Sequence, residues 1–529
     1  MTLKLFVSAV ISAAALASAI APSAAAISLS FQGRFDGGRG EDSAEIGAFD
    51  PGSDQLAITN SSDNTIDLVS IANPAAPELN ATIDLSPFGA GINSVAFGNG
   101  ILAAALEADP VTDQGSVVFF DRNGDFLTQV AVGSLPDMLT FTGDGSKLLI
   151  ANEGEPDDGV DPEGSVSIVD LSGGIANAVV KTATFQRFNG QEESLRANGV
   201  RLFPDVGATL SVAQDLEPEY ITLSEDGTTA YVSLQEANAI GVLDIETAEF
   251  TDIFGLGLKD YSQSGLDASD RDNGINIEPE PVFGLYMPDA IASYTVKDET
   301  YIVTANEGDD RGDANEAERG DAIRIADLAE VTSFGRSGLV LNNSLTTDHM
   351  LEDEALGRLT ISSIDGDTNG DGEIDQLVAY GGRSFSIFKS DGTLVYDSGD
   401  DFEQITARMI PDHFNSSDSD LEEFDARSDN KGPEPEGVTI GRYYGRTMAF
   451  VGLERTGGVM IYDISDPAQA TFLDYAPSLP EDISPEGVLY ISSEDSPTGQ
   501  PLLITTNEVS GTTAIYRIVP ALGAQQIDR

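Results

Sequence analysis

One pattern recurs along this chain: an apolar strand ends in a Glu at a tight corner, and a second apolar strand returns from it. The clearest copy is LLIANEGEPDDGVDPEGSVSIVDL at residues 148–171, where the first strand ends at Asn152-Glu153-Gly154. Four further copies lie at 230–245, 300–328, 449–464 and 502–518. Looser copies lie at 56–71 and 102–120. A unit repeated at intervals of tens of residues favours one repeat-built domain over several unrelated ones.

Each repeat contains about four short strands. LPDMLTFTGDGSKLLIANEGEP, from Leu135, has Pro136-Asp137, a strand, the turn Asp144-Gly145, a second strand and then the corner. The segments that match it begin at Leu216, Met287, Gly432 and Ser484. Four-stranded units joined by Gly, Asp and Asn turns are typical of propeller blades.

We therefore predict an all-β fold, a single β-propeller over residues 27–529. Counting corners gives seven or eight blades, because the weak copy near Arg383 is either a corner or merely a strand. We expect seven four-stranded blades, with the strand from Ile27 completing the last blade to close the ring. Polar, acidic insertions make the spacing irregular, and we interpret them as solvated surface loops. They span 181–215, 257–281, 309–321 and 400–431.

The charge balance limits the possible partners. The 529 residues include 27 Lys and Arg against 89 Asp and Glu, which gives a net charge of −62. No sizeable basic patch is expected, so nucleic acid and anionic membranes are excluded as partners, whereas divalent cations are favoured. A salt-rich or calcium-rich medium that screens the repulsion is the alternative explanation of the same charge. Cysteine is absent, so disulfides and thiolate metal sites are excluded.

The N-terminus predicts export. Lys4 precedes an apolar run at 5–20, and Ala24-Ala25-Ala26 offers a cleavage site, so residues 1–26 are interpreted as a signal peptide. No later stretch approaches the roughly 20 apolar residues of a spanning helix. The tail at 521–529 shows no recognisable anchor. We expect a monomer that is extracellular, periplasmic or associated with the cell surface.

The sharpest local motif lies within IDGDTNGDGEIDQLVAYGGRSFSIF, residues 364–388. Its oxygen donors are Asp367, Asn369, Asp371, the carbonyl of Glu373, and Asp375. Hard oxygens at alternating positions of a tight loop suit calcium, and no nitrogen or sulfur donor is present for zinc. The spacing resembles the calcium loop of FG-GAP repeats in integrin-type propellers. A register from Asp365 resembles an EF-hand but ends on Gln376, so we predict a calcium loop flanked by strands; an Asp-Gly turn without metal is the alternative.

The corners give a broader signal. Equivalent loops of successive blades converge at one end of a propeller channel, so the corner carboxylates are expected to form an acidic ring that holds cations. Its predicted members are Glu153, Glu236, Glu307, Glu454 and Glu508. Glu434, Glu436 and Glu486, which begin blades, are expected to add to the same face. The alternative is that each corner Glu caps backbone amides in its own turn.

No standard catalytic motif is present. The chain lacks GxSxG, HExxH, a Walker A loop and a GxGxxG placed between a strand and a helix, and it has only two His residues. No catalytic residue is therefore assigned. A calcium-dependent phosphoesterase remains an alternative, because metal-bound water needs no Ser or His nucleophile. In that scheme Glu153, Glu307, Glu454 and Glu508 hold metal, and Arg383 or Arg455 pairs with phosphate.

Several motifs in order resemble one known family. They are LTTDHMLEDEALGRLTISSIDGDTNGDGEIDQLVAYGGRSFSIF, GPEPEGV, VGLERTGGVMIYDISDP and TNEVSGTTAIY. The sequence resembles the choice-of-anchor I family of exported β-propellers, in which different C-terminal segments attach the propeller to the surface and some bacterial members carry an alkaline phosphatase label. We expect a secreted calcium-binding propeller used for interaction or adhesion. Surface proteins, glycans and phosphate esters are the partner classes considered.

Overall fold

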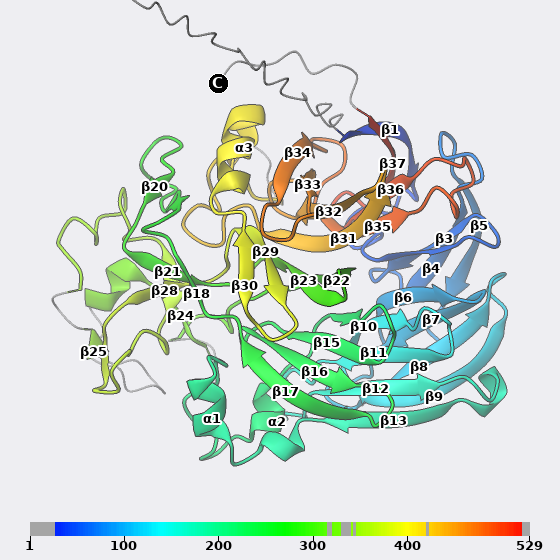
Figure 1. Ribbon diagram of the computed structural model, residues 1–529, viewed down its shortest axis with the longest axis horizontal. Helices are drawn as coiled ribbons and strands as arrows, with labels where there is room; N and C mark the ends of the chain where they lie inside the picture. The colour runs from blue at the N-terminus through cyan, green and yellow to red at the C-terminus, as the bar shows by residue number, and fades with distance from the viewer. Residues whose placement is uncertain (1–26, 315–319, 330–339, 342–344, 419–422, 521–529) are drawn as a thin grey trace, which may run out of the picture.

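The computed structural model describes residues 27–314, 320–329, 340–341, 345–418 and 423–520 (Figure 1). The predicted signal peptide at 1–26 lies outside the described residues. No helix in the described part of the chain is long and apolar enough to cross a membrane.

The described residues form seven four-stranded antiparallel sheets, which we call blades and name A, B, C, D, G, J and L. Blade B contains β2 (Gly47–Asp50), β3 (Gln55–Asn60), β4 (Thr65–Ser70) and β5 (Glu78–Asp84). Blade C contains β6 (Ile92–Gly98), β7 (Ile101–Leu106), β8 (Gln114–Asp121) and β9 (Phe126–Ser134). Blade D contains β10 (Pro136–Phe141), β11 (Lys147–Asn152), β12 (Ser165–Asp170) and β13 (Val179–Thr184).

The remaining blades follow the same plan. Blade G contains β14 (Ile221–Leu223), β15 (Thr229–Leu234), β16 (Ala239–Asp244) and β17 (Glu249–Gly255). Blade J contains β22 (Ile291–Val296), β23 (Glu299–Asn306), β29 (Ser384–Lys389) and β30 (Leu394–Asp397). Blade L contains β31 (Pro435–Tyr443), β32 (Arg446–Leu453), β33 (Val459–Asp463) and β34 (Thr471–Ala476). Blade A contains β35 (Pro485–Ile491), β36 (Leu502–Asn507), β37 (Thr512–Pro520) and β1 (Ile27–Asp36).

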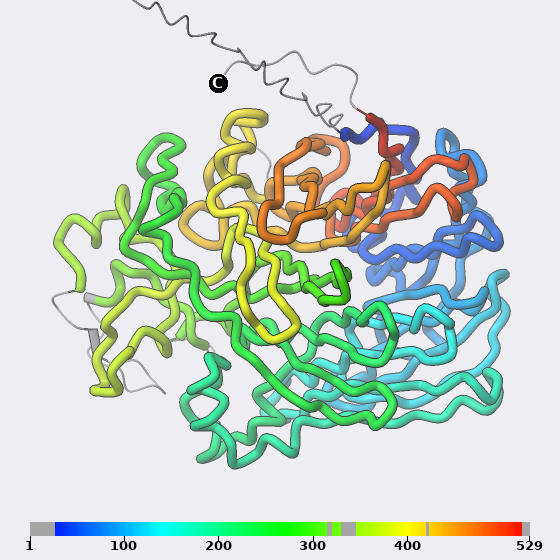
Figure 2. The backbone as a smooth tube through the Cα atoms, in the orientation of Figure 1, coloured from blue at the N-terminus to red at the C-terminus, as the bar shows by residue number. Residues whose placement is uncertain are grey.

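The first strands of the blades close a ring. β2 contacts β6, and contacts continue through β10, β14, β22, β31 and β35 back to β2. β1 closes the ring, because it pairs antiparallel with β37, so that N-terminal and C-terminal strands form one blade. Figure 2 shows the blue N-terminal and red C-terminal strands side by side. The all-β propeller prediction, including the closing N-terminal strand, is confirmed.

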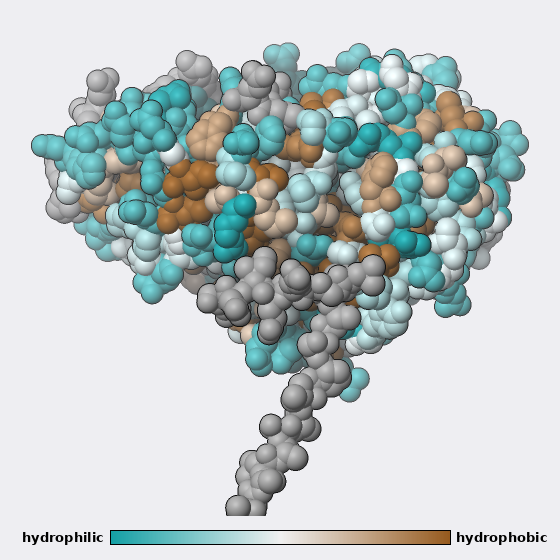
Figure 3. All heavy atoms as spheres, turned by 90° about the horizontal axis from the view of Figure 1, so that it is seen from above, coloured by the Kyte–Doolittle hydropathy of each residue, from teal (hydrophilic) through white to brown (hydrophobic). Residues whose placement is uncertain are grey.

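The hydrophobic core lies between neighbouring blades. Phe119 of blade C packs in one cluster with Leu148 of blade D, and Phe385 of blade J packs with Tyr462 of blade L. Each of these side chains is almost completely buried. Full burial of one large apolar side chain is worth about 1.5–3 kcal/mol, so the interfaces hold the ring together. The outer surface seen from above is largely hydrophilic, with apolar side chains in scattered patches (Figure 3).

The predicted insertion at 257–281 contributes one strand to a further sheet, which differs from the surface loop that the sequence predicts, and the other four strands of this sheet lie outside the predicted insertions. The sheet consists of β18 (Leu258–Asp260), β21 (Val282–Leu285), β28 (Leu377–Ala379), β26 (Thr360–Ser362) and β24 (Ala322–Arg324). Two small ladders join β19 (Gly265–Leu266) to β20 (Glu278–Pro279) and β25 (Val340–Leu341) to β27 (Glu373–Ile374). The reason is a separate apolar cluster, which includes Leu266, Ile323, Leu359 and Leu377.

Short helices lie in the insertions at 181–215 and 400–431 and in two segments outside the predicted insertions. They are η1 (Ile175–Asn177), η2 (Gln186–Phe188), α1 (Glu192–Ala197), α2 (Val212–Asp215), η3 (Ile325–Ala329), α3 (Asp401–Met409) and η4 (Pro411–His413). Phe188, Leu195 and Val212 of the segment at 185–215 join the apolar cluster between blades D and G. Thus the segment is partly core, and it forms one wall of the site described next.

Candidate cation sites at the channel mouth

The corners share one backbone geometry. The N–H of Glu153 donates to the carbonyl of Leu135 at 2.9 Å, and the N–H of Glu508 donates to the carbonyl of Ser484 at 2.8 Å. The equivalent bond in blade L joins Glu454 to the Glu434 carbonyl at 2.8 Å. Each corner is therefore tied to the residue that precedes the first strand of its own blade.

The Asn before the Glu is a structural residue. Asn152 is buried, and its Nδ2 donates to the Ser165 carbonyl at 3.1 Å and to Ser167 Oγ at 3.0 Å. Asn306 is also buried and donates to Ser386 Oγ at 2.8 Å. Buried amides with several partners stabilise the turn, so in the Asn-Glu pair the Asn supports the corner.

A second set of carboxylates lies at the starts of the blades. Pro-Asp or Pro-Glu begins five of the inner strands, and the acidic residues are Asp137, Glu219, Asp289, Glu436 and Glu486. Burial, followed by the charge of Asp289, raises the pKa of Asp137 to about 7. Asp137 belongs to blade D and Asp289 precedes blade J, which is not its neighbour, so these groups face one another across the ring. We call this end of the ring the channel mouth.

In the described part of the chain, three clusters of carboxylates occur there, and each crosses a blade interface. Within a cluster the ligand oxygens lie within 4.8 Å of one another. The D/G cluster consists of Glu153, Glu219 and Glu236; the J/L cluster of Glu307, Glu436 and Glu454; and the A/B cluster of Asp42, Glu45 and Glu508. The first two are built alike: the corner of one blade meets the start and the corner of the next.

The J/L cluster is partly neutralised from within the chain, although burial still raises the pKa of Glu436 and of Glu454 well above the usual range. Lys431 Nζ lies 2.7 Å from Glu307 Oε1 and 3.3 Å from Glu434 Oε2. Arg455 contacts Glu454 at 3.1 Å and Glu434 at 3.4 Å. Burial alone would raise the pKa of Glu434, but Lys431, Arg427 and Arg455 outweigh it and lower the pKa to about 2. Glu434 is thus a buried ion-pair partner and not a free ligand at the mouth.

The D/G cluster has no such compensation. Within the described ranges, no Lys or Arg nitrogen lies within 4.0 Å of a carboxylate oxygen of Glu153, Glu219 or Glu236. Glu236 is 7% exposed, and its Oε2 is buried without a hydrogen-bond partner. Burial raises the pKa of both Glu153 and Glu219 well above the usual range, and the neighbouring carboxylates raise it further. Among the described residues, no side-chain cation therefore contacts this cluster directly, and Arg311 acts on Glu236 only at longer range.

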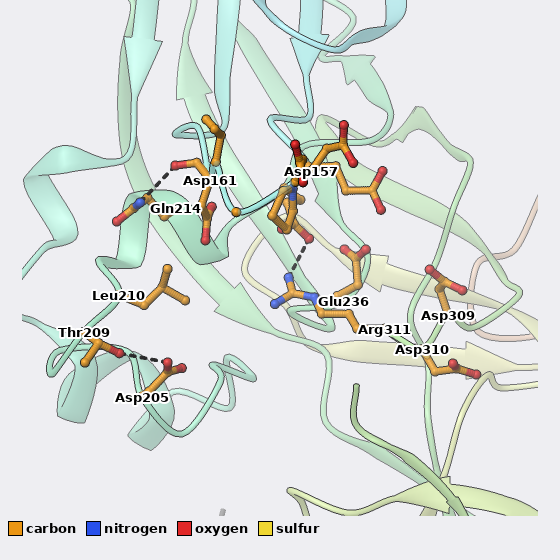
Figure 4. A pocket seen from close by; sticks show the side chains of 16 residues that line it. Asp157, Asp161, Asp205, Thr209, Leu210, Gln214, Glu236, Asp309, Asp310 and Arg311 are labelled. Atoms are coloured by element: carbon orange, nitrogen blue, oxygen red, sulfur yellow. Dashed lines mark hydrogen bonds and ion pairs between the residues drawn. The ribbon is translucent and has the colours of Figure 1, made fainter. Parts of the chain in front are cut away.

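An acidic pocket of about 620 Å³ adjoins the D/G cluster (Figure 4). Nine of its 16 lining residues are Asp or Glu, and Glu236 is one of them. The other walls come from the loop after the Glu153 corner, from residues 205–217 and from 309–311. The structure therefore brings the two acidic stretches at 155–161 and 309–311 together beside one corner.

The capping alternative does not describe the corners. Among the described residues, none of the five corner carboxylates accepts a hydrogen bond from a backbone N–H. Glu307 accepts from Gln235 Nε2 at 2.9 Å and from Lys431, and Glu508 accepts from Ser484 Oγ at 3.4 Å. The structure brings Glu153 together with Glu236, and Glu307 with Glu454, whereas Glu508 lies in the A/B cluster.

The predicted calcium loop lies far along the chain, in the inserted sheet. β26 precedes it and β28 follows it, so it is flanked by strands as expected. Asp367 accepts from the N–H groups of Gly370 at 2.7 Å and Gly372 at 2.9 Å. These amides outweigh a slight burial and lower the pKa of Asp367.

The other predicted loop ligands are linked to one another. Asn369 Oδ1 accepts from the N–H of Asp371, and Asn369 Nδ2 donates to Asp375 Oδ2, both at 2.9 Å. The N–H of Glu373 donates to Asp371 Oδ1 at 2.9 Å. The loop is thus closed by its own side chains and is exposed. Calcium binding there stays a prediction.

The two arginines considered for phosphate are already paired. Arg383 is 3% exposed and donates to Glu403, to the Asp267 carbonyl and to the Ser428 carbonyl. Arg455 forms an ion pair with Asp418 as well as with Glu434. Arg383 therefore supports the insertion, and Arg455 belongs to the neutralised J/L cluster.

Sequence reasoning missed Asp42, Glu45, Glu219 and Lys431. The Pro-acid pair that begins most repeats is a signal for Glu219, since it recurs at the same position of each unit. Glu45 stands at the equivalent position without the Pro. No periodic signal marks Lys431. It ends the insertion at 400–431, and only the folded structure brings it to the channel mouth.

Comparisons with known proteins agree with this architecture. The sequence model of the choice-of-anchor I domain matches residues 45–467. Mesenchyme-specific cell surface glycoprotein of Strongylocentrotus purpuratus is 28% identical over 377 residues, covering 64% of this chain and 46% of that protein. Gigasin-3a of Magallana gigas is 33% identical over 187 residues, covering 31% of this chain and 66% of that protein. The chain thus spans less than two thirds of the length of either relative.

Solved structures resemble the chain more distantly. Hydrazine synthase of Kuenenia stuttgartiensis has a TM-score of 0.46 and 11% identity, covering 92% of this chain and 100% of that one. The β-propeller domain of Cps50 (Swd1) from Myceliophteria thermophila has a TM-score of 0.44 and 9% identity, covering 93% and 100%. The fold assignment rests on the sheets themselves, and the match over residues 45–467, which is most of the sequence, shows that this chain belongs to the choice-of-anchor I domain family.

Proposed function

We propose that this protein is an extracellular β-propeller module that binds divalent cations, calcium by preference, at its channel mouth. The family match and the cell-surface relative support the extracellular propeller. The observation that carries the cation proposal is the D/G cluster, where three carboxylates converge without a partner cation and Glu236 Oε2 has no hydrogen bond.

Calcium is preferred on the chemistry of the donors. All ligands of the D/G and A/B clusters are carboxylate oxygens, which hard cations select, and no thiolate or imidazole contributes. Calcium accepts six to eight oxygens in flexible geometry, whereas magnesium demands near-ideal octahedral geometry at shorter distances. Ligands drawn from two blades suit the more tolerant ion. The loop at 367–375 is proposed as a further, separate calcium site.

Neutralisation of the carboxylates by calcium would also allow the channel mouth to bind a partner molecule. Bound calcium lowers the repulsion among the clustered carboxylates and leaves coordination positions for a partner's oxygens. We therefore propose that the protein serves as a calcium-dependent interaction or adhesion module, with surface proteins or glycans as the partner classes.

Calorimetric titration of calcium into chelator-treated protein tests the proposal. We expect saturable binding to the wild type, weaker binding at one site in Glu219→Gln, and unchanged binding in Glu225→Gln, which removes an equal charge from an exposed turn. Thermal stability should rise with calcium, since a ligand at about 100 times its Kd adds roughly 2.7 kcal/mol. Absence of both saturable heat and a stability gain would contradict the proposal.

The phosphoesterase alternative has less support. The two arginines considered for pairing with phosphate oxygens, Arg383 and Arg455, are both held by carboxylates. Turnover of a generic phosphomonoester that depends on calcium, and that is lost in Glu307→Ala, would revive it.

A further inference from the structure

The acidic pocket beside Glu236 is larger than a metal ion needs. Its volume of about 620 Å³ lies in the range of small-molecule sites, roughly 300–1,000 Å³. One cation held by Glu153, Glu219 and Glu236 would fill only a small part of this space. The pocket is therefore a feature separate from the cluster that it adjoins.

The charge of the pocket lining determines the sign of the charge that a ligand can carry. Nine carboxylates face one cation, Arg311. Arg311 Nη1 lies 2.9 Å from Asp215 Oδ1, and Nη2 lies 2.5 Å from Glu217 Oε2, so this guanidinium is already bound by two acids. An anionic ligand would be repelled, whereas a ligand with several positive charges would be attracted.

The arrangement of the lining selects the shape of a ligand. In Figure 4, Glu236, Asp309 and Asp310 lie on one side, Asp157 and Asp161 on another, and Asp205 stands apart. Pro156, Val160 and Leu210 also line the pocket and supply apolar surface. Separated acids with aliphatic surface among them match ammonium groups joined by methylene chains.

The molecule itself contains an ammonium in an equivalent setting. Lys431 Nζ reaches the corner carboxylate of Glu307, with Asp309 at 3.9 Å and Glu434 at 3.3 Å. Glu236 is the corner residue of the preceding blade, and its Oε2 is buried without a partner. At one corner the chain thus supplies its own primary ammonium; at the neighbouring corner the same kind of carboxylate opens into a pocket.

We propose that the acidic pocket binds a ligand with two or more primary ammonium groups joined by methylene chains, one of which pairs with Glu236. The two sources of this chemistry are a free polyamine and the lysine side chains of a peptide. The proposal goes beyond calcium binding and does not require calcium in the D/G cluster; since Glu236 belongs to both sites, the two cations are expected to compete.

Spermidine is the probe for the test, because it has three amines and no acidic group. The full chain is titrated in chelator at about 0.15 M salt, where the Debye length of about 8 Å screens attraction to the general negative charge. We expect one saturable site, weakened about tenfold in Glu236→Gln, in line with the loss of a charge-assisted bond. Asp157→Asn with Asp158→Asn, on the exposed part of the wall, should weaken it several-fold as well.

Controls distinguish binding in the pocket from general attraction to the net negative charge of the protein. Glu225→Gln removes the same charge from an exposed turn and should leave the spermidine affinity unchanged. 1,8-Octanediol, an uncharged chain of similar length, should not bind. A lysine-rich heptapeptide forms the second arm, and tighter binding than spermidine would identify a peptide as the source.

Two outcomes would overturn the proposal. One is no saturable binding of either amine ligand; the other is equal weakening by the pocket variants and by Glu225→Gln. Calcium titration of the same samples is read separately, so that loss of calcium binding counts against the cation proposal and leaves the amine proposal to its own result. Because the Asp157 and Asp158 side chains are exposed, a folding defect in Glu236→Gln alone does not remove the test.

Discussion

The D/G and J/L clusters have the same arrangement of carboxylates, but they differ in the cationic side chains that contact them. Each joins the corner Glu of one blade to the first and corner carboxylates of the next. In the J/L cluster Lys431 and Arg455 supply counter-charges, whereas the D/G cluster has none among the described residues. The comparison shows that the propeller scaffold alone brings the acids together, and that the local sequence decides whether they become ion pairs or an open cation site.

The local differences are small in sequence. Glu454 is followed by Arg455, but Glu236 is followed by Ala237 and Glu153 by Gly154. The insertion before blade L ends in Lys431, while the loop after Glu153 adds Glu155 and further acids. One cationic residue beside the corner and one at the end of an insertion are sufficient to convert a site of this kind into a structural network.

The largest expected effect comes from removing the internal cation. In Lys431→Met the buried Glu307 and Glu434 lose their closest ammonium, and breaking a buried pair costs about 3–5 kcal/mol. Denaturant unfolding in chelator should show this loss of stability. The exposed Lys297→Met is the matched control and should unfold like the wild type.

Adding calcium gives a second test of the same variant. If the two clusters differ only in their internal cations, calcium should restore part of the stability that Lys431→Met loses, and more than it adds to the control. Wild-type stability of Lys431→Met in chelator would show that the J/L network is not neutralised by Lys431.

The second effect is a pH dependence whose sign differs between two kinds of buried carboxylate. Burial, followed by the charge of Asp289, raises the pKa of Asp137 to about 7, and burial is also the largest cause that raises the pKa of Asp289 to about 6. The folded state then binds more protons than the unfolded state between about pH 4 and 7, so the free energy of unfolding falls as the pH rises through this window. Glu434, whose pKa is lowered to about 2, stabilises the fold above pH 4.5 and loses that contribution only as the pH falls toward 2.

Denaturant titrations in chelator at pH 5 and pH 8 measure whether the free energy of unfolding rises or falls with pH. We expect greater stability at pH 5, and a smaller difference in Asp137→Asn. Equal stability at the two pH values in the wild type would mean that the mouth carboxylates are neutralised in some other way.

A smaller effect is expected for Glu236→Gln. The change removes a buried charge without a hydrogen-bond partner from beside Glu153 and Glu219, so the chelator-treated protein should gain roughly 1–2 kcal/mol. The stability gained from calcium should shrink at the same time. Thermal unfolding with and without calcium measures both; a destabilised apo variant would show that Glu236 already has a partner.

The fold and half of the site could be predicted from the sequence. The corner Glu residues recur at one position of a visible repeat, and repeats of a propeller place equivalent loops at one end. Asn152 and Asn306 recur for a different reason, since they hold the corner from inside the blade. The same repetition therefore marked both a structural Asn and a Glu that joins a carboxylate cluster, and only the contacts of each separate the two roles.

What the sequence did not predict depends on contacts between distant segments. Which corner meets which blade start is set by the ring, so the pairing of Glu153 with Glu219 has no local signal. The inserted sheet is assembled from strands of three or four residues that lie far apart in the sequence, held by an apolar core that is too dispersed to recognise. Lys431 reaches the mouth for the same non-local reason.

The smallest effect on overall stability is expected at the loop of residues 367–375. Asp371 is exposed and accepts one hydrogen bond, from the N–H of Glu373, so Asp371→Asn should change the free energy of unfolding in chelator by no more than about 0.5 kcal/mol. Calcium titration should nevertheless lose one site, because the carboxylate is a predicted ligand, while the D/G site lost in Glu219→Gln stays in place. Asp391→Asn, at an exposed turn of blade J where the carboxylate accepts from the N–H of Thr393, is the matched control. An unchanged number of calcium sites in Asp371→Asn would leave the loop as a turn closed by its own side chains and would assign all calcium binding to the blade interfaces.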